Sequence, residues 1–219
     1  MGKYLVSLLL AAIAVAGSSA LGQEADVALV NLISGDVSYV PRSGIPGKVQ
    51  PFMKLRDGDR IKLAVDGRVR LVFFEAARQE LWAGPASFRV GKTAAEPISG
   101  RAAEARNLPA GVAQGMARIP EAIQASRLGG SRLRSLAPRQ TTAGGEQKAA
   151  LAQARAAYES LRQDMPADDI TPEFYLYAAL YEFLVYDEMK AVVAEMRRKQ
   201  PNNVQVKELD AWLTNRMSR

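Results

Sequence analysis

The sequence predicts an α+β fold of two modules, an N-terminal antiparallel β sandwich or barrel and a C-terminal set of α-helical hairpins. Three observations lead to this prediction. Short segments of alternating apolar and polar residues, separated by Gly- and Asp-containing turns, occupy residues 26–95. Apolar residues recur at helical spacing over residues 146–219. Residues 96–145 contain no aromatic residue and are rich in Gly, Ala and Arg, which predicts a flexible linker.

Residues 1–22 have the pattern of an export signal peptide. Lys3 supplies a positive charge, and an apolar run from Tyr4 to Val15 precedes a stretch of small residues. We expect cleavage after Gly22, with cleavage after Ala20 as the alternative. Because the apolar run is short for a membrane span, we expect a periplasmic or secreted protein that is not transmembrane after cleavage. A retained N-terminal anchor is the other interpretation.

Composition limits the chemistry that the chain can perform. The protein has 219 residues, a formal net charge of +6, and neither Cys nor His. This excludes thiol nucleophiles, His-based catalytic triads and zinc sites with the usual sulfur and nitrogen ligands. The carboxylate pairs Glu75 with Glu80 and Asp168 with Asp169 belong to no recognisable catalytic motif. We therefore expect a protein that is not an enzyme and that has no metal and no cofactor.

The Asp66-Gly67 pair is the strongest turn signal in the β segment, because alternating apolar stretches flank it. A three-residue loop ending at Gly67 would pair Leu63 with Val69 and leave one clean apolar face. A two-residue loop would pair Leu63 with Arg70 and mix apolar and charged side chains on both faces. The sequence therefore predicts a β-hairpin here, with a positive φ at Gly67.

Four turn-and-strand patterns follow one another in this segment: Gly35-Asp36-Val37, Leu55-x-x-Gly58-Asp59-x-Ile61, Gly67-Arg68-Val69-Arg70-Leu71 and Leu81-x-x-Gly84-Pro85-Ala86-x-Phe88. In this order they resemble the FecR-like extracytoplasmic domain. The resemblance implies a β-sheet module that binds partners in the bacterial envelope, without chemistry of its own.

The C-terminal segment contains a second family pattern. A helix start at Thr171-Pro172-Glu173 is followed by large, small and aromatic residues at Phe174, Ala178 and Tyr181. Tyr186-Asp187-Glu188 then opens another helix, which ends before Pro201. This pattern resembles a tetratricopeptide repeat, a helical hairpin of about 34 residues. The resemblance implies paired helices, with the final helix as a cap.

The same resemblance divides the first helix of the repeat into two faces. Phe174, Tyr177, Ala178 and Tyr181 are expected to form a buried stripe. On the exposed concave face, where such repeats bind peptides, the candidate partner-binding residues are Tyr175, Ala179, Glu182 and Phe183.

Two further features are candidates for polymer binding. Trp82 could stack on a sugar ring, although a strand Trp beside Leu81 and Phe88 is more often a core residue. A basic cluster in the predicted linker could contact anionic envelope polymers or lipid headgroups, or could be a solvated linker; it consists of Arg127, Arg132, Arg134 and Arg139.

These features favour a periplasmic adaptor that holds protein partners of the envelope through both modules. The alternative is a protein whose β module binds cell-wall glycan such as peptidoglycan, or another anionic envelope polymer, while the helices complete the fold. Nucleic acid is not an expected partner of an exported protein.

Overall fold

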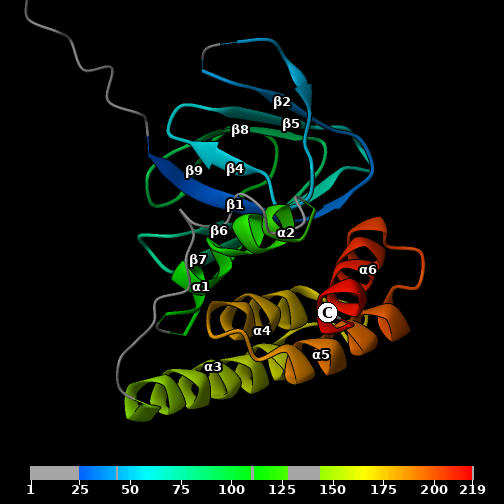
Figure 1. Cartoon of the computed structure of the whole chain (residues 1–219). Helices are drawn as coiled ribbons and strands as arrows, with labels where there is room; N and C mark the ends of the chain where they lie inside the picture. Colours follow the sequence, from blue (N-terminus) through cyan, green and yellow to red (C-terminus); the bar gives the residue numbers. More distant parts are fainter. Residues whose placement is uncertain (1–24, 43, 110, 128–143, 219) are drawn as a thin grey trace, which may run out of the picture.

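The structure is a computed structural model and describes residues 25–42, 44–109, 111–127 and 144–218. It confirms an α+β architecture, with two antiparallel sheets followed by helices (Figure 1). The predicted signal peptide, residues 1–22, lies outside the described residues. So do Arg132, Arg134 and Arg139 of the basic cluster, together with the side chain of Arg127.

Ten strands form two five-stranded sheets in the described part of the chain. Sheet A has the order β10 (Glu104–Asn107), β7 (Arg78–Ala83), β6 (Arg68–Phe73), β1 (Asp26–Ser34) and β4 (Lys54–Arg56). Sheet B has the order β3 (Gly47–Lys48), β2 (Val37–Val40), β5 (Arg60–Leu63), β8 (Ala86–Val90) and β9 (Ala95–Ser99). Apolar side chains from both sheets form one buried cluster between them, including Leu71 of β6 and Phe88 of β8. The pair of sheets is therefore a sandwich.

Helices cover the other face of sheet A, so that the molecule has three layers (Figure 1). Leu29 and Val72, whose neighbours in sequence point into the sandwich, join a second buried cluster with the helical side chains. The helices are α1 (Val112–Met116), α2 (Ile119–Arg127), α3 (Gly144–Asp164), α4 (Thr171–Glu182), α5 (Tyr186–Lys199) and α6 (Val204–Met217). None of the helices in the described ranges is long and apolar enough to cross a membrane.

The predicted β-hairpin at Asp66-Gly67 is wrong. β5 belongs to sheet B and β6 to sheet A, so the turn carries the chain from one sheet to the other. Gly67 is not among the described glycines with a positive φ. Glycine is required at this position for a steric reason instead, because a Cβ there would lie 2.7 Å from the carbonyl oxygen of Asp36. The turn at Asp66-Gly67 therefore packs against the turn at Gly35-Asp36. The backbone amide of Ala64 donates a hydrogen bond to the same carbonyl oxygen of Asp36 at 3.0 Å.

The structure also differs from the flexible linker predicted over residues 96–145. The described part of that range contains most of β9 and all of β10, α1 and α2. β9 pairs with β8, and β10 pairs with β7, so both segments satisfy their backbone groups at sheet edges. Val112, Met116 and Ile119 are buried between the sheet and the other helices. The prediction failed because the segment has no aromatic residue and we expected it to bury little apolar surface. Medium-sized apolar residues bury enough surface to order it.

Candidate functional site

A groove of about 350 Å³ is lined by residues of α1, α3 and α4 and by Arg118. These three helices belong to the helical layer below sheet A (Figure 1). Five small residues contribute to its walls, and aromatic, amide and charged side chains complete them. The lining consists of Gly111, Gln114, Gly115, Arg118, Ala150, Gln153, Ala154, Tyr175, Ala179, Glu182 and Phe183.

The shape of the groove depends on a close approach of α1 to α4. A Cβ built on Gly115 would lie 2.4 Å from Cε2 of Tyr175, so the tyrosine ring rests directly on the glycine. Gly111, with a φ of 81°, turns the chain into α1. On the opposite side of the groove, Ala150 and Ala154 of α3 have small side chains that leave space open. A larger side chain at Gly115 would force the two helices apart.

One ion pair and one phenol supply the polar chemistry of the groove. The guanidinium of Arg118 donates to the carboxylate of Glu182, and neither side chain is fully buried. Burial raises the pKa of Tyr175, with Arg118 acting in the opposite direction, so the phenol is neutral at physiological pH. Its hydroxyl makes no hydrogen bond to another described residue and can serve a ligand.

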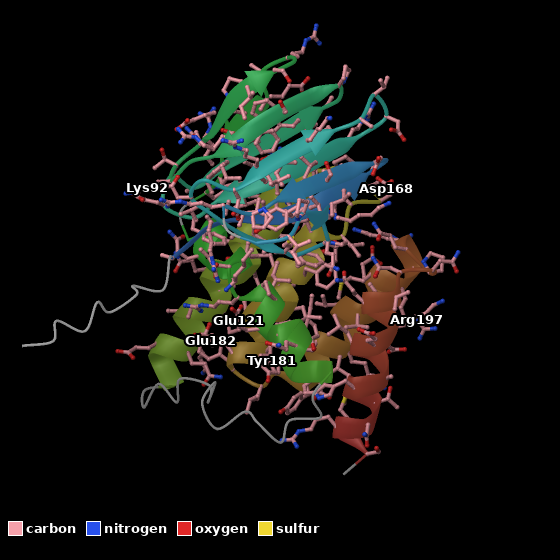
Figure 2. All side chains as sticks on the ribbon, turned by 90° about the horizontal axis from the view of Figure 1, so that it is seen from above. Lys92, Glu121, Asp168, Tyr181, Glu182 and Arg197 are labelled. Atoms are coloured by element: carbon pink, nitrogen blue, oxygen red, sulfur yellow. The ribbon has the colours of Figure 1, made fainter. Side chains whose placement is uncertain are left out.

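The four candidate residues of the predicted concave face, Tyr175, Ala179, Glu182 and Phe183, all line this one groove. The predicted exposure of Tyr175 is nevertheless wrong, since it is only 6% exposed, whereas Tyr181 of the expected buried stripe is half-buried. The physical reason is α1, which covers the face of α4 that carries Tyr175. Figure 2 shows Glu182 and Tyr181 in the helical layer, away from the strands.

Trp82, the separate candidate for partner or sugar binding, lies elsewhere and is inaccessible to a ligand. It is 1% exposed between the two sheets, and its ring stacks on Phe88 with 4.3 Å between the centroids. Its indole Nε1 donates to Oε2 of Glu80 at 3.0 Å. The structure therefore confirms the core interpretation of Trp82 and removes the proposed stacking on a sugar.

Sequence reasoning missed the walls that α1 and α3 contribute. Gln114 donates weakly to the carbonyl of Phe74 at 3.4 Å, and Gln153 of α3 makes no hydrogen bond to another described residue. One signal was present in the sequence, namely small residues four apart at Gly111 and Gly115 and again at Ala150 and Ala154. Such spacing places small side chains on one helix face, where another helix or a ligand can approach closely.

The groove offers binding groups: an apolar surface, two amides, a phenol and a balanced ion pair. Within the described ranges there is no group of three or more Asp or Glu side chains placed to hold a metal ion. No family model, curated protein or solved structure matches this chain.

Proposed function

We propose that this protein is an exported, non-enzymatic adaptor of the bacterial envelope that holds a peptide segment of a protein partner in the groove between α1, α3 and α4. The observation that carries the proposal is the convergence of Tyr175, Glu182 and Phe183 on one groove. The tetratricopeptide resemblance had assigned the same residues to a peptide-binding face.

The lining indicates the chemistry of the peptide. Tyr175, Ala179 and Phe183 offer an apolar surface to a side chain of small or medium size. The free amide of Gln153 and the weakly bonded amide of Gln114 can pair with peptide backbone groups. Because Arg118 and Glu182 balance each other, the groove favours an uncharged segment over an acidic or a basic one.

The sequence resemblances support the envelope location. The FecR-like patterns lie in the segment that forms the sandwich, and the tetratricopeptide-like pattern lies in α4 and α5. Export is proposed from the leader pattern, with cleavage after Gly22. N-terminal sequencing of the protein purified from envelope fractions tests this point, and a mature protein starting at Met1 or Gly2 would contradict it.

A peptide-display selection on the purified chain tests the groove. Peptides enriched on the wild type should share an apolar residue flanked by uncharged positions, and they should lose binding to Ala179→Trp, which fills the groove. Lys207→Trp, on the exposed face of α6, is the matched control and should retain binding. Equal binding to both variants would place the peptide site elsewhere.

The alternative is binding of cell-wall glycan. Its candidate stacking residue, Trp82, is buried, so the groove residues are the ones to test. Sedimentation with purified peptidoglycan separates the two functions. If the wild type cosediments with peptidoglycan and Ala179→Trp does not, the result would favour glycan binding and contradict the peptide proposal.

A further inference from the structure

A second pocket, of about 290 Å³, lies between the outer face of sheet A and the end of α3. Two rows of cross-strand neighbours form its floor. Arg70, Leu81 and Glu104 make one row across β6, β7 and β10, and Gln79 and Arg106 lie in the next. Asp164 and Pro166 close the pocket from the helical side. The loop between α3 and α4, which Figure 2 marks at Asp168, reaches the sheet here.

Arg106 is the cation of this pocket that forms no salt bridge with a described carboxylate, whereas Arg70 is paired. Its Nε donates to Oε1 of Gln79 at 2.5 Å, and its Nη1 donates to the backbone carbonyl of Asp164 at 3.2 Å. Both acceptors are neutral, and no carboxylate of the described residues lies within salt-bridge distance of Arg106. Partial burial and the nearby Arg70 lower the pKa of Arg106, and the carboxylates of Asp164 and Asp169 oppose this shift without reversing it. Arg70 differs, because it is paired with Asp169.

Gln79 supplies the second observation. The residue is 3% exposed and lines the pocket, and its Nε2 has no hydrogen-bond acceptor. The bond from Arg106 holds the amide oxygen, so the amide nitrogen is left as a donor. A buried donor without an acceptor is costly. Because Nε2 is shielded from solvent, a ligand oxygen would satisfy it once the amide turns towards the pocket.

We propose that this pocket binds the carboxylate group of a small molecule, with Arg106 and the amide nitrogen of Gln79 as donors to its oxygens. A guanidinium matches the planar carboxylate with two parallel hydrogen bonds. Leu81, Ala105 and Pro166 give the rest of the ligand apolar contact. The site is separate from the groove between α1, α3 and α4, and it does not depend on the function proposed for that groove.

The remaining charges favour a singly charged ligand. Glu104 and Asp164 also line the pocket, and Asp169 lies behind Arg70. These carboxylates would repel a phosphate dianion more strongly than a singly charged carboxylate. A carboxylate that also carries an ammonium group, as an amino acid does, would meet both signs of charge.

Titration of the full purified chain with acetate, glycine and inorganic phosphate at constant ionic strength tests the site. The side-chain Nε–H signal of Arg106 in two-dimensional NMR, assigned through Arg106→Gln, should shift saturably with acetate or glycine. Phosphate should give a smaller response. In Arg106→Gln the effect of the carboxylate ligands on the melting temperature should require about tenfold more ligand or disappear.

Two variants make the test specific. Arg101→Gln removes the same charge from an exposed position outside the pocket and should leave the response intact. Gln79→Glu places a carboxylate beside Arg106 and should abolish the response while the protein stays folded. A linear shift shared by all anions, an equal loss in Arg101→Gln, an unchanged response in Gln79→Glu, or a response to phosphate alone would overturn the proposal.

Discussion

Arg70 on β6 donates a hydrogen bond to the carboxylate of Asp169, 99 residues later in the loop before α4, and both residues are buried. The other carboxylate oxygen of Asp169 accepts from the amide of Thr171 at 2.9 Å. Burial acts to raise the pKa of Asp169, but Arg70 and Thr171 outweigh it and hold the pKa below its usual value. This ion pair therefore joins the outer face of sheet A to the first turn of α4.

Breaking this pair on one side should be more costly than removing it altogether. Asp169→Asn leaves Arg70 charged and buried, and we expect a loss of about 3–5 kcal/mol in the free energy of unfolding. The double variant Arg70→Met with Asp169→Leu should lose less than either single variant. Urea unfolding at pH 7 measures all of these. Asp168→Asn, at the exposed neighbour, is the control, and a loss there equal to that of Asp169→Asn would contradict the account.

The turns of the β segment were predictable from the sequence, but the sheet that each strand joins was not. Gly35 has the φ of 67° that a turn allows, and Asp66-Gly67 is indeed a turn. A β-hairpin and a sheet-to-sheet crossing both use such turns. The choice depends on β6, which is buried on both faces because helices much later in the chain cover it. No local alternation pattern carries that information.

The candidate site was also predictable only in part from the sequence. The tetratricopeptide resemblance was sufficient to assign Ala179, Glu182 and Phe183 to one face of α4 and the residue after it. It could not show that the short helix α1 covers this face, because the burial of Val112 and Met116 comes from elements distant in sequence. Tyr175 was therefore predicted in the correct groove but with the wrong exposure.

Glu173 is predicted to stabilise the helical layer. Its carboxylate is 1% exposed and accepts from Lys199 at 2.6 Å and from Arg162 at 3.0 Å, which links α4 to α5 and α3. Glu173→Gln would leave Arg162 without its counter-charge and Lys199 with only Glu195, at 3.6 Å, and the expected cost is about 3–5 kcal/mol. The control is Glu188→Gln, which removes an exposed ion pair with Arg155, with an expected cost below about 1 kcal/mol. Similar melting temperatures for the two variants would show that the buried carboxylate contributes little.

The decrease in the free energy of unfolding at alkaline pH should depend on Tyr39. Burial and the hydrogen bond to Asp59 raise the pKa of its phenol to about 12, above its usual value of 10.0. The folded state then holds its proton where the unfolded state loses it, so this stabilisation is complete below pH 10 and is lost as pH rises towards 12.

Tyr39→Phe should accordingly flatten the fall in unfolding free energy between pH 10 and 12. Tyr158, with a pKa also raised to about 12 by burial and by Glu173, lies in the helical layer, so its effect should add to that of Tyr39. Urea titrations at several pH values, together with tyrosinate absorbance, provide the test. An unchanged slope in the double variant would count against both assignments.

Gly115 should determine both stability and binding. Gly115→Ala brings a methyl group within 2.4 Å of the Tyr175 ring, and we expect a loss of about 1–3 kcal/mol together with weaker peptide binding. Gly144→Ala is the matched control, because no atom lies within 4 Å of its Cβ position. Thermal unfolding compares the two, and a stabilised Gly115→Ala variant would mean that α1 does not press on α4.

The most direct test of the proposed function is photocrosslinking in intact cells that export the chain. A photoreactive residue replaces Ala179 in the groove or, as the control, Lys207 on α6. We predict a discrete, protease-sensitive adduct from Ala179 alone, with the crosslinked partner peptide carrying an apolar residue flanked by uncharged positions. Adducts of equal yield from both positions, or only a glycan adduct from Ala179, would contradict the assignment of the groove as a site for a protein partner.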